Sequence, residues 1–107
     1  MTTPDAPEKT EEYKQLLGAR VLWPPDMPDN MVENAIEIAR DCLEKEGLNP
    51  EKDACLIAEK IKKEFDEKWS CYWHVVVGKN FGCHMIHEQR RFLHFYLGQF
   101  AFLVFKG

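Results

Sequence analysis

The 107-residue sequence lacks several features that would define its environment. It has no apolar run near the ~18 residues that a membrane-spanning helix needs. Its polar beginning, MTTPDAPEKTEEYK, lacks the apolar core of a secretory signal. We therefore expect a reducing environment in which the four cysteines stay free thiols. There is also no basic block, and the net charge of −4 argues against a nucleic-acid partner.

Hydrophobic residues make up 45 % of the chain, which is enough for a folded domain. We place a single domain at residues 13–107, after a flexible acidic tail over residues 1–12 that is too polar to bury much surface. The short apolar stretch YKQLLGARVLW, residues 13–23, is either a peripheral strand or a segment docked on the surface.

Two helices are predicted in the first two thirds of the chain, where apolar residues recur at spacings of three and four. The first extends from Pro28, as its first helical residue, to Glu46. The second begins with Asn49 as its N-cap and Pro50 as its first residue, and ends near residue 69. We expect Cys42 and Cys55 to be small core residues of these helices.

From residue 72 the pattern becomes extended. Segments rich in β-branched and aromatic residues are separated by short connectors, and they predict strands at 72–78, 82–88, 92–98 and 99–106. The fold class is therefore α+β, with two helices packed on a mostly antiparallel sheet of four to five strands.

Cysteine and histidine are concentrated in one stretch, which raises the question of a zinc site at Cys71, His74, Cys83, His84 and His87. Structural zinc takes four such ligands, usually in close pairs. Alternate residues of a strand point to opposite faces, so neighbouring ligands here diverge, and no C-x2-C pair is present. We expect no metal and no cofactor.

A thiol enzyme is the second alternative for this stretch. It would need a cysteine beside a histidine that a third group orients. Cys83 and His84 are adjacent in a predicted strand, so their side chains point apart. No glycine elbow that would present a nucleophile is visible either. We therefore expect no catalytic residues.

The C-terminal half carries a family resemblance. YWHVVVGKNFGCHMIHE followed by FLHFYLGQFAFLVFK closely resembles the eight-kilodalton class of dynein light chains, and DMPDNM and IKKEFDEKW extend the similarity to about residues 21–107. The resemblance implies a non-catalytic, strand-exchanged dimer. Two grooves at its interface would bind extended peptides by strand addition.

The resemblance also implies site residues. The peptide-binding set is Asn80, Phe81, Gly82, Cys83, His84, Met85, Ile86 and His87, with Phe92, His94 and Tyr96 on one face of the next strand and Glu51 and Lys52 at the helix start. The dimer-interface set is Lys62, Lys63, His74, Val77, His84 and Ile86. The family usually has hydroxyl side chains in place of Cys83, His84, Ile86 and His94, so we expect a different target motif.

The partners that the resemblance implies are dynein intermediate chains, or other proteins with extended linear motifs, in a microtubule-associated motor complex. The implied location is the cytoplasm and its cytoskeleton, and the long N-terminal extension favours an axonemal member in cilia or flagella. Axonemal and cytoplasmic dynein both stay open. A homodimer and a heterodimer with a related light chain both stay open. So does a role as a general dimerisation hub, or as an inhibitory subunit, for non-motor partners. We expect no nucleic-acid and no membrane partner.

Overall fold

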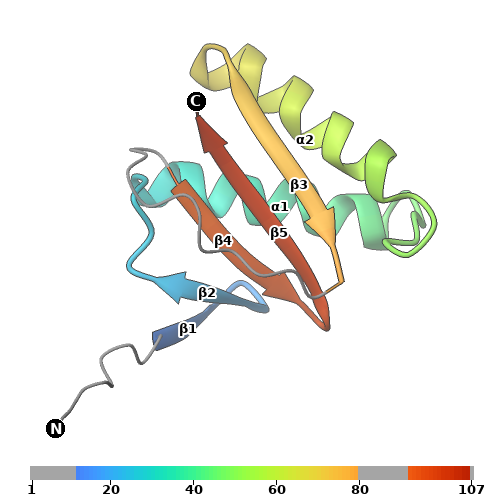
Figure 1. Cartoon of the computed structure of the whole chain (residues 1–107), viewed down its shortest axis with the longest axis horizontal. Helices are drawn as coiled ribbons and strands as arrows, with labels where there is room; N and C mark the ends of the chain where they lie inside the picture. Colours follow the sequence, from blue (N-terminus) through green and yellow to red (C-terminus); the bar gives the residue numbers. More distant parts are fainter. Residues whose placement is uncertain (1–11, 80–91, 107) are drawn as a thin grey trace, which may run out of the picture.

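The computed structural model describes residues 12–79 and 92–106 (Figure 1). Within these ranges the elements follow in the order β1 (Glu12–Leu16), β2 (Ala19–Trp23), α1 (Asp29–Glu44), α2 (Ala54–Trp69), β3 (Trp73–Gly78), β4 (Phe92–Leu97) and β5 (Phe100–Lys106). The strands form one sheet in the spatial order β1-β2-β4-β5-β3. All the pairings are antiparallel.

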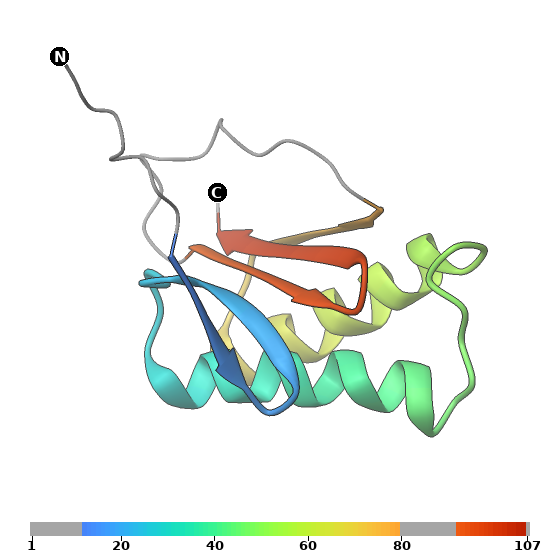
Figure 2. The ribbon, with the colours of Figure 1, turned by 90° about the horizontal axis from the view of Figure 1, so that it is seen from below.

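Both helices lie on the same side of this sheet, and α2 runs beside β3 (Figures 1 and 2). The predicted α+β class, with two helices on an antiparallel sheet, is confirmed. The apolar stretch at 13–23 forms the hairpin of β1 and β2, so of the two alternatives the structure shows a strand. It forms two strands, however, and only β1 lies at the edge of the sheet. The strand predicted at 82–88 lies outside the described residues, and so does the tail up to residue 11; Glu12 already belongs to β1.

The core lies between the helices and the facing side of the sheet. The largest fully buried side chains come from both layers, as the 3.6-residue and two-residue periods require: Trp73, Phe65, Phe95, Phe102, Ile36, Ile57, Ile61 and Leu93. Cys42 belongs to this core as expected. Cys55 is exposed, so its prediction as a core residue was wrong; it lies off the buried stripe of Ile57, Ile61 and Phe65.

The helix starts differ from the predicted ones. The carbonyl of Pro28 accepts the N–H groups of Met31 and Val32, which makes Pro28 the cap and not the first helical residue. The second start is displaced further. Asn49 Oδ1 accepts a hydrogen bond from the Glu51 N–H at 2.8 Å, and its carbonyl accepts the Lys52 N–H at 3.0 Å. Residues 49–53 therefore form a turn, and α2 begins only at Ala54.

Candidate functional site

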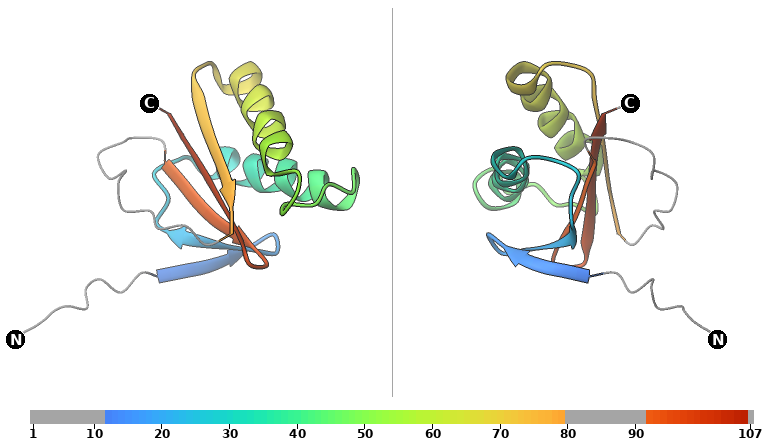
Figure 3. Two further views of the ribbon diagram at one scale, coloured as in Figure 1. Left: turned by 45° about the vertical axis from the view of Figure 1, so that its right-hand side comes forward. Right: turned by 90° about the vertical axis from the view of Figure 1, so that its left-hand side faces the viewer.

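Both helices lie on one side of the sheet and leave its other side free of helices (Figure 3). We call this side the outer face. Alternation assigns its members, because their neighbours along each strand belong to the core cluster. Register then aligns them across strands, with Phe92 opposite Phe105, which is opposite His74, and with His94 opposite Leu103, which is opposite Val76.

His94 lies at the centre of the outer face. Its side chain is buried, with 4 % of its surface exposed, and its ring centroid lies 5.2 Å from that of Tyr96. Leu103, its cross-strand partner, is 2 % exposed. The structure therefore brings three predicted site residues, Phe92, His94 and Tyr96, together on one face, as alternation along β4 requires.

β3 forms one edge of the sheet. Within the described residues it pairs with β5 alone, so its other side offers unpaired N–H and C=O groups. Such an edge is a template for another strand. The exposed imidazole of His74 stacks on the Phe105 ring at this edge, with centroids 5.3 Å apart. The edge and the outer face are therefore continuous at His74.

The other predicted interface residues in the described ranges are distributed over two elements. Val77 packs against the helix-covered core, on the opposite side of β3 from His74. Lys62 and Lys63 lie on α2, where both line an open cavity of about 500 Å³ together with the exposed Leu56. The structure therefore does not gather Lys62, Lys63, His74 and Val77 into one cluster.

Glu51 and Lys52 are exposed in the turn before α2. A Glu51 carboxylate oxygen lies 3.8 Å from Lys79 Nζ, and Lys79 directly follows β3. This turn therefore lies beside the point where the chain enters residues 80–87. Asn80, Phe81, Gly82, Cys83, His84, Met85, Ile86 and His87 themselves lie outside the described residues.

A second cavity, which lies on the outer face, was not predicted from the sequence. It has a volume of about 360 Å³ and is lined by Tyr13, Arg20, Lys79, Tyr96 and Gln99. The only sequence signal was the position of Arg20 between Ala19 and Val21. Those two residues are buried, so the alternation of β2 directs Arg20 to the outer face.

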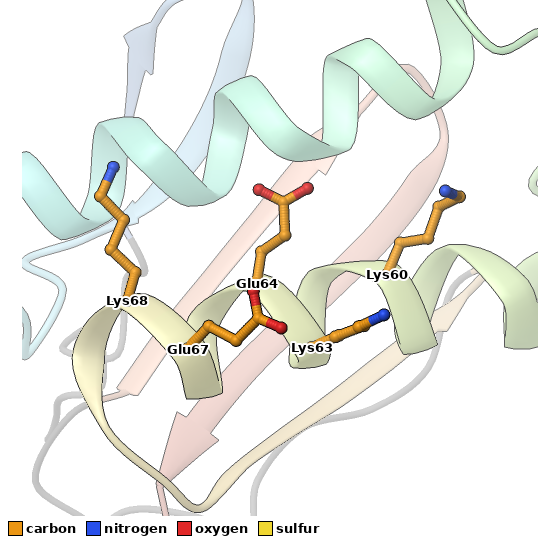
Figure 4. Close-up of a pocket in the computed structure, with 5 residues that line it drawn as sticks. All are labelled: Lys60, Lys63, Glu64, Glu67 and Lys68. Carbon is orange, nitrogen blue, oxygen red and sulfur yellow. The ribbon is translucent and has the colours of Figure 1, made fainter.

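A larger open hollow, of about 570 Å³, is lined by residues of α2 only: Lys60, Lys63, Glu64, Glu67 and Lys68 (Figure 4). Its lining is charged throughout, with both signs present. Lys60 already pairs with Glu46 at 3.1 Å. This is a solvated helix face with no apolar or convergent group that would select a ligand.

The described part of the chain contains no group of three or more potential metal ligands. Cys71 and His74 are both exposed there, while Cys83, His84 and His87 lie outside the described ranges. Among the described helices, none is both long and apolar enough to cross a bilayer.

Comparison with known proteins gives a family and a shared fold. The family model described as "Dynein light chain type 1" matches residues 19–107. Two solved structures of the dynein light chain-like domain of the Fasciola hepatica calcium binding protein FhCaBP2 are similar. Its mercury derivative has a TM-score of 0.72 at 17 % identity and covers 88 % of this chain and 96 % of that chain. Its native form has a TM-score of 0.66 at 15 % identity, with coverage of 96 % and 98 %.

Proposed function

The chain belongs to the dynein light chain family, and we propose that it is a non-catalytic, dimeric light chain of a dynein motor complex. It binds extended segments of dynein intermediate chains by β-strand addition. The observation that carries this proposal is the helix-free outer face, with its aromatic centre, beside the edge of β3 that no described strand pairs with.

The open edge gives the dimer a physical rationale. In a strand-exchanged dimer, residues 81–87 of one subunit pair with β3 of the other and satisfy the hydrogen-bonding groups of that edge. The outer faces then lie against each other around His74 and His94. The second edge of the exchanged strand is left for a peptide, whose backbone pairs there while nearby pockets select its side chains.

The peptide site in this proposal combines the segment 80–87 with three parts of the described fold. Phe92, His94 and Tyr96 supply an aromatic wall, and Glu51 and Lys52 lie beside the start of the segment through the contact of Glu51 with Lys79. Each site alone is small. Two sites on one dimer gain affinity when both strands come from one dimeric partner, because the second strand binds at a high effective concentration.

The cellular setting that we propose is the cytoskeleton, in the axoneme of cilia or flagella. The support is the N-terminal extension, which forms β1 and precedes residue 19, where the match to the family begins. β1 lengthens the sheet on the side opposite β3, so it adds surface without obstructing the proposed dimer edge.

Sedimentation of the full chain tests the dimer. We expect a dimer at micromolar concentration, and we expect His74→Lys to weaken it by about tenfold or more, because like charges would face each other at the seam. Asn30→Lys adds the same charge at an exposed position of α1 and should leave the dimer intact. A monomer for the parent chain, or equal effects of the two substitutions, would overturn the proposal.

Peptide binding needs its own measurement. Fluorescence anisotropy with labelled segments of dynein intermediate chains should show saturable binding, which Tyr96→Ala weakens and Leu56→Ala, on α2, does not.

A peptide array separates the two roles of the dimer. A dedicated motor subunit binds few sequences, whereas a general hub or inhibitory subunit binds many unrelated ones.

A further inference from the structure

The guanidinium of Arg20 lies against two neighbouring tyrosine rings on the outer face. Its guanidinium carbon lies 4.7 Å from the ring centroid of Tyr96 and 5.4 Å from that of Tyr13. The two rings are themselves 6.0 Å apart, in an edge-to-face arrangement. Cation–π contacts of this kind fix the plane of a guanidinium while its N–H edge stays available for hydrogen bonds.

Arg20 also lacks an acidic partner within the described residues. Arg40, by contrast, uses its guanidinium on the Glu44 carboxylate and on the Leu17 carbonyl. An arginine that contacts two rings and has no acidic partner in the described part of the chain suits an external anion. The planar fork of N–H groups suits an oxyanion that accepts two parallel hydrogen bonds.

Two further polar groups line the same cavity. Lys79 also lines the cavity, and its Nζ lies 3.8 Å from a Glu51 carboxylate oxygen. This contact is exposed and therefore weak, so an anion in the cavity can compete for the ammonium. Gln99, in the turn between β4 and β5, supplies an amide. The cavity of about 360 Å³ is open to solvent and admits a group larger than a single ion.

We propose that this cavity binds a phosphoryl group through Arg20 and Lys79, with Gln99 as a neutral donor. A phosphate monoester carries a charge of about −1.5 to −2 at neutral pH and three acceptor oxygens, which suits two cations and an amide. The group belongs either to free phosphate or to a phosphorylated side chain. The site goes beyond the proposed function, since it requires neither a dimer nor strand addition, although the two sites share Tyr96.

The N-terminal extension completes this site. Tyr13 lies on β1, before the matched family range, whereas Arg20, Lys79, Tyr96 and Gln99 lie inside it. One of the two rings that hold the guanidinium therefore comes from the part of the chain that the family match does not include. The pairing of β1 with β2, in which Tyr13 lies opposite Leu22, fixes its position.

Nuclear magnetic resonance of the full chain tests the site. Sodium phosphate is titrated against sodium chloride at constant ionic strength and pH 7, and the Arg20 Nε–H and the Gln99 side-chain amide are followed. A second titration uses a short phosphoserine peptide and its unphosphorylated form. We expect saturable shifts of both reporters with phosphate and with the phosphopeptide, and none with chloride or the unphosphorylated peptide.

Three substitutions locate the binding. Arg20→Gln should weaken it by about tenfold or more, because a charge-assisted, forked contact is lost. Lys79→Gln should weaken it severalfold. Lys106→Gln is the matched control, since Lys106 also lies over an aromatic ring, that of Trp73 at 5.4 Å, but at the opposite end of the sheet.

The outcomes decide both the site and its source. Tighter binding of the phosphopeptide assigns the site to a phosphorylated side chain, and equal binding assigns it to free phosphate. Absence of saturable shifts, or an equal loss in Lys106→Gln, overturns the proposal. If Arg20→Gln disrupts the hairpin, which would be seen as loss of the β1 amide signals, Lys79→Gln becomes the deciding variant. Unchanged phosphate binding in Lys79→Gln would then overturn the proposal.

Discussion

A carboxylate oxygen of Asp66 accepts a hydrogen bond from the backbone N–H of Trp73, with 2.9 Å between the heavy atoms. The other oxygen pairs with Lys62, one turn earlier on α2. Asp66 thus connects the C-terminal part of α2 to the first residue of β3, the strand at the edge of the sheet. The Lys62 hydrogen bond is the main cause that lowers the pKa of Asp66 from its ordinary value, and the bond from Trp73 adds to it.

This arrangement predicts an acid-sensitive contribution to stability. A carboxyl whose pKa is lowered by folding stabilises the folded chain fully at any pH above its unfolded-state pKa of about 3.9. This stabilisation is lost as the pH falls through the lower pKa of the folded state. Asp66→Asn keeps the shape of the side chain but removes the charge. We expect lower stability at pH 7 and a flatter decline below about pH 4.

Urea unfolding between pH 7 and pH 3, followed by circular dichroism, measures this effect. Glu67→Gln is the control, because it removes one negative charge from the neighbouring, exposed position. If both variants lose the same stability at every pH, the loss comes from general charge and not from the contacts of Asp66 with Lys62 and Trp73.

The second prediction concerns the core beneath β3. Phe65 is fully buried, and its ring meets that of Trp73 edge-on with centroids 5.0 Å apart. Phe65→Ala should lower the free energy of unfolding by about 3–5 kcal/mol through lost burial and a residual cavity. Leu56→Ala, on the same helix but at a site 43 % exposed, should change it by less than about 0.5 kcal/mol.

Urea titrations give both free energies of unfolding. If Phe65→Ala does not fold, Phe65→Leu takes its place, with an expected loss of about 1.5 kcal/mol. Equal effects at Phe65 and Leu56 would mean that α2 does not pack on the sheet through the face described above.

The sequence predicted the fold to the extent that periodicity records burial. The stripe that contains Phe65 and the alternation of Leu93 and Phe95 follow directly from packing one face of each element against the other layer. Asn49 was misread because the same side chain satisfies backbone N–H groups in a cap and in a turn. Cys55 was misplaced because small apolar character was given more weight than its position off the buried stripe.

The site was less predictable than the fold. Alternation was enough to place Phe92, His94 and Tyr96 on one face. The contact of Arg20 with the Tyr96 ring depends on the pairing of β2 with β4, which are far apart in sequence, and no local pattern specifies that register. The roles of the predicted peptide-binding and interface residues stay predictions that the binding and sedimentation measurements address.

The third prediction concerns the turn of the N-terminal hairpin. Leu17 and Gly18 both have positive φ, at 51° and 85°, as a two-residue hairpin turn requires. Only glycine adopts this region without strain. Gly18→Ala should therefore destabilise the hairpin by about 1 kcal/mol, and Leu17→Asn should stabilise it by up to about 1 kcal/mol, because asparagine tolerates this conformation.

Hydrogen exchange of the β1 and β2 amides measures these local free energies, and the two substitutions control each other because their signs are opposite. A Cβ on Gly18 would lie 3.6 Å from Arg40 Nη1, an ordinary contact, so the backbone is the expected source of the cost. If Gly18→Ala leaves the exchange rates unchanged, the turn does not have the backbone conformation described here.

The fourth prediction concerns thiol reactivity. Cys55 and Cys71 are exposed, whereas Cys42 is buried in the core. Burial raises the pKa of the Cys42 thiol, and the Glu46 carboxylate raises it further, so the reactive thiolate is disfavoured on two grounds. In a Cys83→Ser background, a chromogenic disulfide reagent at pH 8 should modify two thiols quickly. Cys42 should react more slowly by a factor of about a thousand or greater. The reagent reaches it only when the chain opens or unfolds, which costs ~5 kcal/mol or more.

Cys42→Ser in the same background is the control, and it should remove the slow phase while leaving the two fast ones. Adding urea should speed the slow phase in proportion to the unfolded fraction, whereas the fast phases should change little. Three fast thiols in the folded protein would contradict the packing of α1 against the sheet, since Cys42 is covered only while that helix stays in place.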